Sequence, residues 1–288
     1  MHEITVRLLF AQVIYYGSWL VFPLLWWFIK KRWILPILLS LLFIYARFIE
    51  PKLIFVHHYK IETGFQAKIA LISDIHLGIY NDASLLERTV AKINTLDIDA
   101  LLIAGDFTYE PQLDDLETLF SSLSEVNVPI YAVLGNHDRE VPGPKIRDEL
   151  ERVLSSLGVN VIDNRVAKLG EVTIVGLGSR WARDDDVTLL DDYSEPESLI
   201  VLTHNPDTAL DFTEDHYPDL TLTGHTHGGQ VRLPYLYKKV IPVEGTVLWD
   251  QGLYTYQGHK VFVSSGLGEI GLPFRFLIPP TIDVLELY

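Results

Sequence analysis

The chain has 288 residues, 48% of them hydrophobic, which is enough for a sizeable core. It contains no cysteine, so disulfides, thiolate metal sites and cysteine nucleophiles are excluded. The net charge of −15 is uneven, because residues 1–68 hold eight Lys/Arg and three Asp/Glu, whereas residues 69–288 hold fifteen and thirty-five. The acidic part is a poor binder of long nucleic acid, and it would need metal ions to handle phosphates.

Residues 1–52 predict a membrane anchor. Residues 8–29 form an uncharged run of 22 residues, long enough to cross a hydrocarbon layer about 30 Å thick as a helix. A cleaved signal peptide is the alternative, but no small-residue cleavage site follows the run. Beyond the basic Lys30-Lys31-Arg32, a second uncharged run predicts a span at about 33–49, with a re-entrant or interfacial helix as its alternative.

If both segments cross the membrane, the basic loop between them should face the cytoplasm. Residues 53–288 would then lie on the other side. The positive charges of Arg7, Arg47, Lys52 and Lys60 near the opposite ends weaken this charge bias. The prediction is therefore a membrane location with a lean toward an extracytoplasmic catalytic region.

From residue 53 the chain predicts a single α/β domain that ends at residue 288. A strand at 53–61 is followed by strands at 69–73, 100–104 and 130–134, which alternate with helices at about 84–95, 113–124 and 146–157. This alternation gives a mainly parallel sheet covered by helices. The later part is richer in strands and indicates a second sheet, with strands expected at 159–162, 172–177, 199–203, 220–223, 230–233, 261–265 and 281–286.

Polar residues follow five of these strands at the point where each strand ends. Carboxylate, imidazole and amide groups of this kind are ligands of borderline divalent metals. At a spacing of two, both members of each Asp-x-His or His-x-His pair should leave the same side of an extended backbone. Seven ligands are too many for one ion, but two ions about 3.5–4 Å apart that share a carboxylate use them all. The candidate ligands are Asp74, His76, Asp106, Asn136, His204, His225 and His227.

These blocks resemble the signature of the calcineurin-like metallophosphoesterase superfamily from about residue 69 to the carboxyl terminus. The resemblance implies a four-layer α/β/β/α sandwich, here preceded by one or two transmembrane helices. It also implies two divalent metal ions, Mn, Fe, Zn or Ni, with Mn favoured. One ion would be held by Asp74, His76, Asp106 and His227, and the other by Asp106, Asn136, His204 and His225, with Asp106 bridging.

Within the superfamily, residues 72–78, 203–207 and 224–230 are similar to a bacterial membrane-associated branch. That branch includes phosphodiesterases of cell-envelope substrates and some UDP-2,3-diacylglucosamine pyrophosphohydrolases, and it implies a bacterial inner membrane location. The pyrophosphate of that lipid lies on the cytoplasmic face, in conflict with the topology that the basic loop indicates. Residues 178–184 replace a shorter acidic turn of the branch, so the substrate pocket is expected to differ.

The expected reaction is hydrolysis of a phosphate ester or pyrophosphate by a water that two metals bridge and activate. His137 is not needed as a ligand, so it is free to protonate the leaving oxygen or stabilise charge, and Asp138 is expected to orient it. Arginine presents a planar fork to phosphate, so additional phosphate binding is predicted at Arg139, Arg180, Arg183, Arg232 and Arg275.

These observations predict a membrane-anchored, dinuclear-metal phosphohydrolase acting on a lipid or cell-envelope precursor. Its expected partners are the bilayer and a phosphate-containing small molecule or lipid, but no long nucleic acid. The alternatives are a general phosphodiesterase of small nucleotides and a non-catalytic membrane scaffold. Residues 235–239 and 272–280 are apolar enough to form a lipid-facing rim, unless they pack against the sheet edge.

Overall fold

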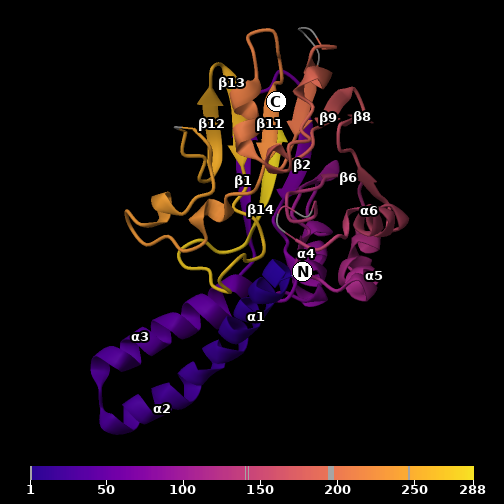
Figure 1. Ribbon diagram of the computed structural model, residues 1–288. Helices are drawn as coiled ribbons and strands as arrows, with labels where there is room; N and C mark the ends of the chain where they lie inside the picture. Colours follow the sequence, from indigo (N-terminus) through magenta and orange to yellow (C-terminus); the bar gives the residue numbers. More distant parts are fainter. Residues whose placement is uncertain (1, 140, 142, 194–197, 246) are drawn as a thin grey trace.

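A computed structural model describes residues 2–139, 141, 143–193, 198–245 and 247–288. Two six-stranded sheets form the centre of the molecule (Figure 1). In the first sheet the last strand of the chain lies between two early ones, so both ends of the region 55–287 meet there. Its strands, in spatial order, are β1 (Phe55–Ile61), β14 (Thr281–Leu287), β2 (Ala67–Ile72), β4 (Ala100–Ala104), β6 (Ile130–Val133) and β7 (Val159–Val161).

The second sheet is parallel in its centre and has an antiparallel strand at each edge. A small parallel pair, β3 (Leu77–Gly78) with β5 (Thr108–Tyr109), lies apart from both large sheets. The strands of the second sheet, in spatial order, are β12 (Gly252–Tyr256), β13 (His259–Val263), β11 (Leu220–Thr223), β10 (Leu199–Leu202), β9 (Val172–Gly176) and β8 (Arg165–Leu169).

The apolar side chains of the strands alternate between two cores, because successive residues point to opposite faces of a sheet. In β2, Ile69 and Leu71 enter a core shared with Leu202 and Phe262 of the second sheet. Ile72, on the other face of β2, packs into the core beneath the helices. The two sheets are therefore held face to face by a continuous apolar layer.

Helices cover the outer face of the first sheet, namely α4 (Ala83–Ile93), α5 (Leu116–Phe120) and α6 (Arg147–Ser156). The carboxylate of Asp82 caps α4 by accepting a hydrogen bond from the Ser84 amide at 3.0 Å. The outer face of the second sheet is covered by 3-10 helices at Val187–Leu190 and Pro206–Asp211 and by the buried Trp249. The predicted four-layer arrangement is confirmed, with a fourth layer of short helices and loops.

Most predicted strands are confirmed, and the differences concern the sheet edges. The strand predicted at 230–233 is wrong, because only Val231 makes a β-bridge there, with Phe276. The prediction also missed β8 and β12, which are the two edge strands of the second sheet. Edge strands carry polar residues on an exposed face, so they lack the continuous apolar run that marks a buried strand.

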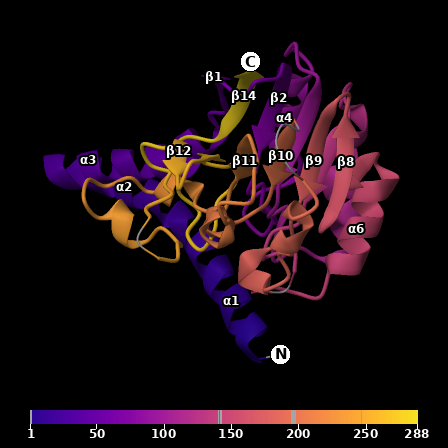
Figure 2. The same ribbon diagram turned by 90° about the horizontal axis from the view of Figure 1, so that it is seen from above.

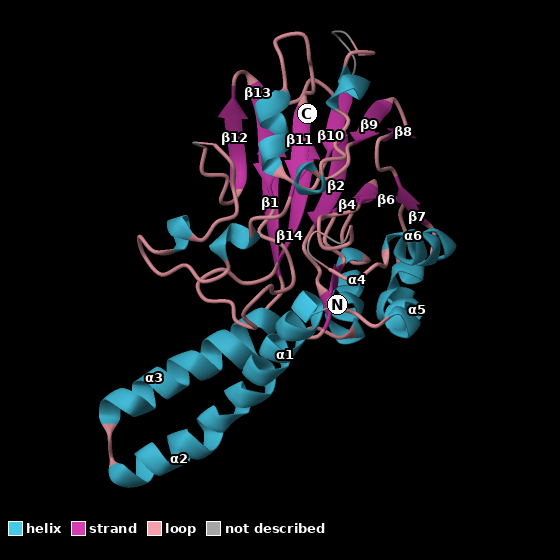
Figure 3. Ribbon diagram, in the orientation of Figure 1, coloured by secondary structure: helices cyan, strands magenta, loops and turns pink. Residues whose placement is uncertain are grey.

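A helical hairpin projects from the domain (Figures 1 and 2). Figure 3 shows the helices in cyan: α1 (His2–Gly17) lies at the base, and the hairpin consists of α2 (Val21–Lys31) and α3 (Ile34–Ile44), continued by a π-helical turn at Tyr45–Ile49 and a 3-10 turn at Glu50–Lys52. A 3-10 turn at Ser18–Leu20 separates α1 from α2 and ends three residues before Pro23. By length and composition, Val6–Lys31 and Ile34–Lys52 are both able to cross a membrane.

The base of the hairpin is attached to the domain through the loop between β13 and β14. The Arg275 amide donates a hydrogen bond to the Ala46 carbonyl at 3.0 Å, and the Phe43 and Phe274 rings meet with centroids 5.3 Å apart. The amide of Ile278 donates to the buried carboxylate of Glu50 at 2.6 Å. These contacts fix where the hairpin leaves the domain.

Candidate metal centre

The carboxyl ends of strands from both sheets meet at one place, and the polar residues that follow them converge there. Ligands of opposite sheets can meet because β2, β4 and β6 are parallel neighbours in the first sheet, and β10 and β11 are parallel neighbours in the second. Six of the seven predicted ligands form two compact triads, each buried and with its ligand atoms within 4.8 Å of one another.

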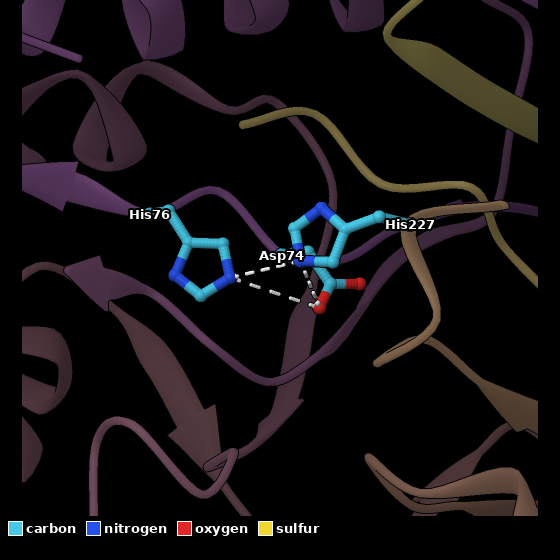
Figure 4. Close-up of side chains that lie close together, drawn as sticks. All are labelled: Asp74, His76 and His227. Carbon is cyan, nitrogen blue, oxygen red and sulfur yellow. Dashed lines mark hydrogen bonds and ion pairs between the residues drawn. The ribbon is translucent and has the colours of Figure 1, made fainter. Parts of the chain in front are cut away.

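The first triad consists of Asp74, His76 and His227 (Figure 4). The Nε2 atoms of the two imidazoles are 3.1 Å apart. Oδ1 of Asp74 lies 3.4 Å from Nε2 of His227 and 3.9 Å from Nε2 of His76. One carboxylate and two imidazole nitrogens thus point toward a single small volume.

The second triad consists of Asp106, His204 and His225. Nε2 of His204 lies 3.2 Å from Oδ2 of Asp106 and 3.1 Å from Nδ1 of His225. The same oxygen of Asp106 is 3.5 Å from Nε2 of His76 in the first triad. Asp106 therefore lies between the triads, where a shared ligand would have to be.

Hydrogen bonds from two ligand imidazoles to backbone carbonyls determine which of their ring nitrogens face the site. Nδ1 of His76 lies 3.1 Å from the Thr108 carbonyl, and Nδ1 of His204 lies 2.7 Å from the Ala104 carbonyl. A carbonyl oxygen only accepts, so each Nδ1 carries a proton, and in the neutral form of each ring Nε2 directs a lone pair into the site. This arrangement is typical of metal-bound imidazoles.

The atoms present fit divalent metal ions. Nε2 of His76 directs its lone pair at Nε2 of His227, so the two nitrogens repel each other unless a proton or a cation lies between them. Oδ1 of Asn136, the seventh predicted ligand, is buried and has no hydrogen-bond partner among the described residues, while Nδ2 donates to the Val141 carbonyl at 2.9 Å. A buried, unpartnered oxygen is costly, and a nearby cation would remove that cost.

The charge state of the cluster also favours cations. Burial lowers the pKa of His76 to about 3 and holds the pKa values of His225 and His227 well below the usual range, so these rings are neutral. Burial opposes protonation of His204, but the adjacent Asp106 carboxylate outweighs it and raises the pKa of His204 to about 9. A metal ion at the second triad would displace that proton.

Left-handed backbone brings the ligands together. Five of the predicted ligands have a positive φ, between 48° and 72°: Asp74, His76, Asp106, His225 and His227. The Asp-x-His and His-x-His pairs were expected to lie on extended backbone. That backbone prediction is wrong, although the ligand side chains do converge. Such conformations are unfavourable for residues with a Cβ and concentrate at functional sites.

His137 lies at the wall of the site. Its ring centroid is 5.3 Å from that of His76 and 5.8 Å from that of Tyr109, and its amide donates to Oδ1 of Asp106 at 3.0 Å. The ring lines the open cavity rather than joining either triad. This position suits a group that meets a bound substrate.

Asp138 holds the loops that carry the ligands. Its Oδ2 accepts hydrogen bonds from the amides of Phe107 and Gly135, and its Oδ1 accepts from the amide and hydroxyl of Thr108, all at 2.9–3.0 Å. Four hydrogen bonds occupy the carboxylate, and their donors flank Asp106 and Asn136. Asp138 therefore positions the metal-binding loops, and the expectation that it also orients His137 stays a prediction.

Among the described residues that line the cavity beside the triads, there is none of the arginines predicted to bind phosphate. Arg275 is fully buried and donates to the carbonyls of Ser265, Gly268 and Ile278, so its predicted phosphate contact is corrected to a structural role. The other arginines lie elsewhere: Arg139 pairs with Asp163 and Asp184, Arg180 with Asp211 and Glu244, and Arg232 with Asp250, while Arg183 is exposed at the end of a 3-10 helix.

The metal centre opens into a largely apolar cavity of about 770 Å³. Trp181, which lies within residues 178–184, where the pocket was expected to differ, is part of this wall, and its ring centroid is 4.5 Å from that of His225. Gln230 joins two wall segments, since its amide donates to the Ile270 and Leu272 carbonyls and its oxygen accepts from the Ile270 amide. The remaining wall includes Val231, Leu233, Leu236, Val240, Pro242 and Phe274.

Two Asp/His triads, with Asp106 of the second beside His76 of the first, lie at the strand ends of a two-sheet α/β sandwich and define a candidate dinuclear metalloprotein. The family described as calcineurin-like phosphoesterase matches residues 67–229, more than half of the chain. The chain belongs to this family. The triads fit the dinuclear site that the family uses.

Individual relatives support the same assignment. The chain is 31% identical to the metallophosphoesterase YkuE of Bacillus subtilis, covering 84% of this chain and 88% of the relative. It is 30% identical to the phosphodiesterase YaeI of Escherichia coli, over 76% of this chain and 82% of that relative. It is 26% identical to the UDP-2,3-diacylglucosamine pyrophosphatase LpxG of Chlamydia trachomatis, over 85% of this chain and 93% of that relative.

Proposed function

We propose that this protein is a membrane-anchored phosphohydrolase that uses two divalent metal ions, Mn favoured, to cleave a phosphodiester or pyrophosphate in a lipid or envelope precursor. The observation that carries this proposal is the position of the two triads at the end of an apolar cavity. A phosphate at the triads would place the rest of the substrate along aliphatic and aromatic side chains, which suits an acyl chain better than a polar nucleotide.

The ions, when bound, would neutralise phosphate oxygens and lower the pKa of a water molecule. Asp74, His76 and His227 would hold one ion and His204, His225 and Asn136 the other, with Asp106 shared. His137 would protonate the leaving oxygen or stabilise charge on the transferred phosphoryl group, because its ring faces the cavity beside the triads.

The test is hydrolysis of alkyl 4-nitrophenyl phosphodiesters by the full-length protein reconstituted in nanodiscs and loaded in turn with Mn, Zn, Fe or Ni. We expect metal-dependent release of nitrophenol and a KM that falls as the alkyl chain lengthens from two to twelve carbons, since each buried methylene contributes about 0.8 kcal/mol. A KM independent of chain length would contradict the lipid substrate. Absence of metal-dependent hydrolysis would instead favour the non-catalytic scaffold.

The names of two relatives give two substrate candidates, a nucleotide-linked diacyl lipid and a less specific phosphodiester. The apolar wall favours the first. The charge bias of Lys30, Lys31 and Arg32 favours a catalytic domain outside the cytoplasm, which would be away from that lipid's pyrophosphate. A topology reporter fused after Tyr288 should give an extracytoplasmic signal, and a cytoplasmic signal would restore the nucleotide-linked lipid as the leading candidate.

A further inference from the structure

The loop at residues 233–240, called here the 233–240 loop, exposes large apolar side chains at the mouth of the cavity. Tyr235 is 87% exposed, Leu236 56% and Val240 67%. The loop is nevertheless ordered by its own hydrogen bonds, from the Leu236 amide to the Leu233 carbonyl and from the Val240 amide to the Tyr237 carbonyl, each at 3.1 Å. A fixed, exposed apolar surface of this kind marks an interaction site.

The charge of the loop limits the kind of partner. Lys238 and Lys239 are both exposed and follow each other in its 3-10 helix, Tyr237–Lys239. They lie within a region, residues 69–288, that holds fifteen Lys/Arg and thirty-five Asp/Glu. Aromatic and aliphatic residues next to lysines are characteristic of segments that lie in the interface of an anionic bilayer.

The loop is joined through a short path to the helical hairpin. Val231, just before the loop, makes a β-bridge with Phe276, and the Arg232 amide donates to the Phe276 carbonyl at 2.9 Å. Two residues earlier, Phe274 packs against Phe43 of the hairpin. Figures 1 and 2 show this part of the chain, in orange and yellow, on the side of the domain from which the hairpin projects.

The length of the hairpin gives an independent constraint. Ser18 is held at the hairpin base, where its hydroxyl accepts a hydrogen bond from the buried Arg47, and α2 ends at Lys31. At about 1.5 Å per residue, this stretch extends about 21 Å beyond the base, whereas the hydrocarbon layer is about 30 Å thick. The basic tip can reach the far headgroups only if the base of the domain sinks by roughly 9 Å, a depth that interfacial segments reach.

We infer that the 233–240 loop is a second membrane contact, which inserts Tyr235, Leu236 and Val240 into the near interface while Lys238 and Lys239 meet the phosphates of anionic lipids. This inference rests on the membrane anchor of the proposed function. Leu236 and Val240 also line the cavity, so the contact turns the cavity mouth toward the bilayer. A lipid substrate would then reach the metal centre without crossing water.

The absence of cysteine permits a direct test. Single variants Leu236→Cys and Val240→Cys of the full chain carry an environment-sensitive nitrobenzoxadiazole label and are reconstituted in vesicles of phosphatidylcholine and phosphatidylglycerol. Val166→Cys and Leu253→Cys are matched controls, because both residues are exposed apolar residues on edge strands of the second sheet. We expect blue-shifted emission and quenching by doxyl-labelled lipid at 236 and 240 only.

Equal, weak quenching at all four positions in protein that floats with the vesicles would overturn the second contact and leave the anchor intact. Protein that does not float with the vesicles would overturn both. Neither outcome affects the metal-dependent hydrolysis that tests the reaction. The lysines are tested by adding Lys238→Gln and Lys239→Gln to the labelled Leu236→Cys chain. This double change should weaken quenching in vesicles that contain phosphatidylglycerol but not in vesicles of pure phosphatidylcholine. An equal effect in both kinds of vesicle would contradict the lysine contact.

Discussion

Oδ2 of Asp106 lies 3.5 Å from Nε2 of His76, although the two residues belong to different triads. The same oxygen lies 3.2 Å from Nε2 of His204. Asp106 Oδ2 therefore lies within 3.5 Å of an imidazole nitrogen of each triad. Both metal positions should therefore depend on Asp106, whereas a ligand of one triad, such as His227, should affect mainly one position.

The first prediction concerns metal stoichiometry. His227→Ala removes one ligand of the first triad, so the purified variant should retain roughly one ion per chain in place of two. Asp106→Asn keeps the side-chain size but removes the shared charge, so the affinity for both ions should fall on the order of a hundredfold. Elemental analysis after dialysis measures both. An Asp106→Asn protein that retains two ions would exclude the bridging role.

His137→Ala tests catalysis separately from metal binding. The ring lines the cavity and is not a member of either triad, so both ions should remain. Turnover should fall by a factor of about a hundred to ten thousand, the usual contribution of a positioned acid. The measurements are kcat on an alkyl 4-nitrophenyl phosphodiester and metal content on the same sample. Loss of an ion in this variant would reassign His137 to the metal site.

Gly135→Ala should disturb the metal centre without removing any ligand. A Cβ at this position would overlap the Asp106 carboxylate and the Asp106 amide, which is main chain and cannot easily move. The expected result is loss of at least one ion and a lower Tm. Gly17→Ala is the control, because nothing lies within 4 Å of its added Cβ. Normal metal content in Gly135→Ala would show that the Asp106 loop is more adaptable than its packing indicates.

The position of the site could be predicted from sequence because apolar strands ended at polar blocks, and parallel strands bring such ends together. That logic located Asp74, Asp106 and His204 without any knowledge of their distances. It failed where tertiary pairing decides the role of a residue. Arg275 has the chemistry of a phosphate ligand, but its guanidinium is occupied by backbone carbonyls. Trp181 was not predicted individually, although it lies within residues 178–184, where the pocket was expected to differ.

The backbone of the site was also beyond sequence reasoning. A spacing of two suggested extended strands, whereas Asp74 and His76 both lie in left-handed turns. Only neighbouring glycines indicate such crowding: a Cβ at Gly266 would press on the Asp74 side chain. Strain of this kind is maintained by the surrounding packing, and short-range patterns do not encode it.

The last prediction concerns the pH dependence of stability through Asp283, a buried residue of β14. Burial raises the pKa of Asp283 to about 7, against hydrogen bonds from Ser264 and Thr281 that lower it. The folded protein therefore binds a proton that the unfolded chain has released between about pH 4 and pH 7. In that window the stability must fall as the pH rises, by at most about 4 kcal/mol in total.

Asp283→Asn cannot ionise, so it should remove this loss. Its Tm should exceed that of the wild type at pH 8, and the difference should shrink toward pH 4. The fully exposed Asp97→Asn is the matched control and should follow the wild-type pH profile. Thermal unfolding of the metal-free proteins from pH 4 to pH 8 gives the measurement, and parallel profiles for Asp283→Asn and wild type would show that Asp283 is ionised throughout.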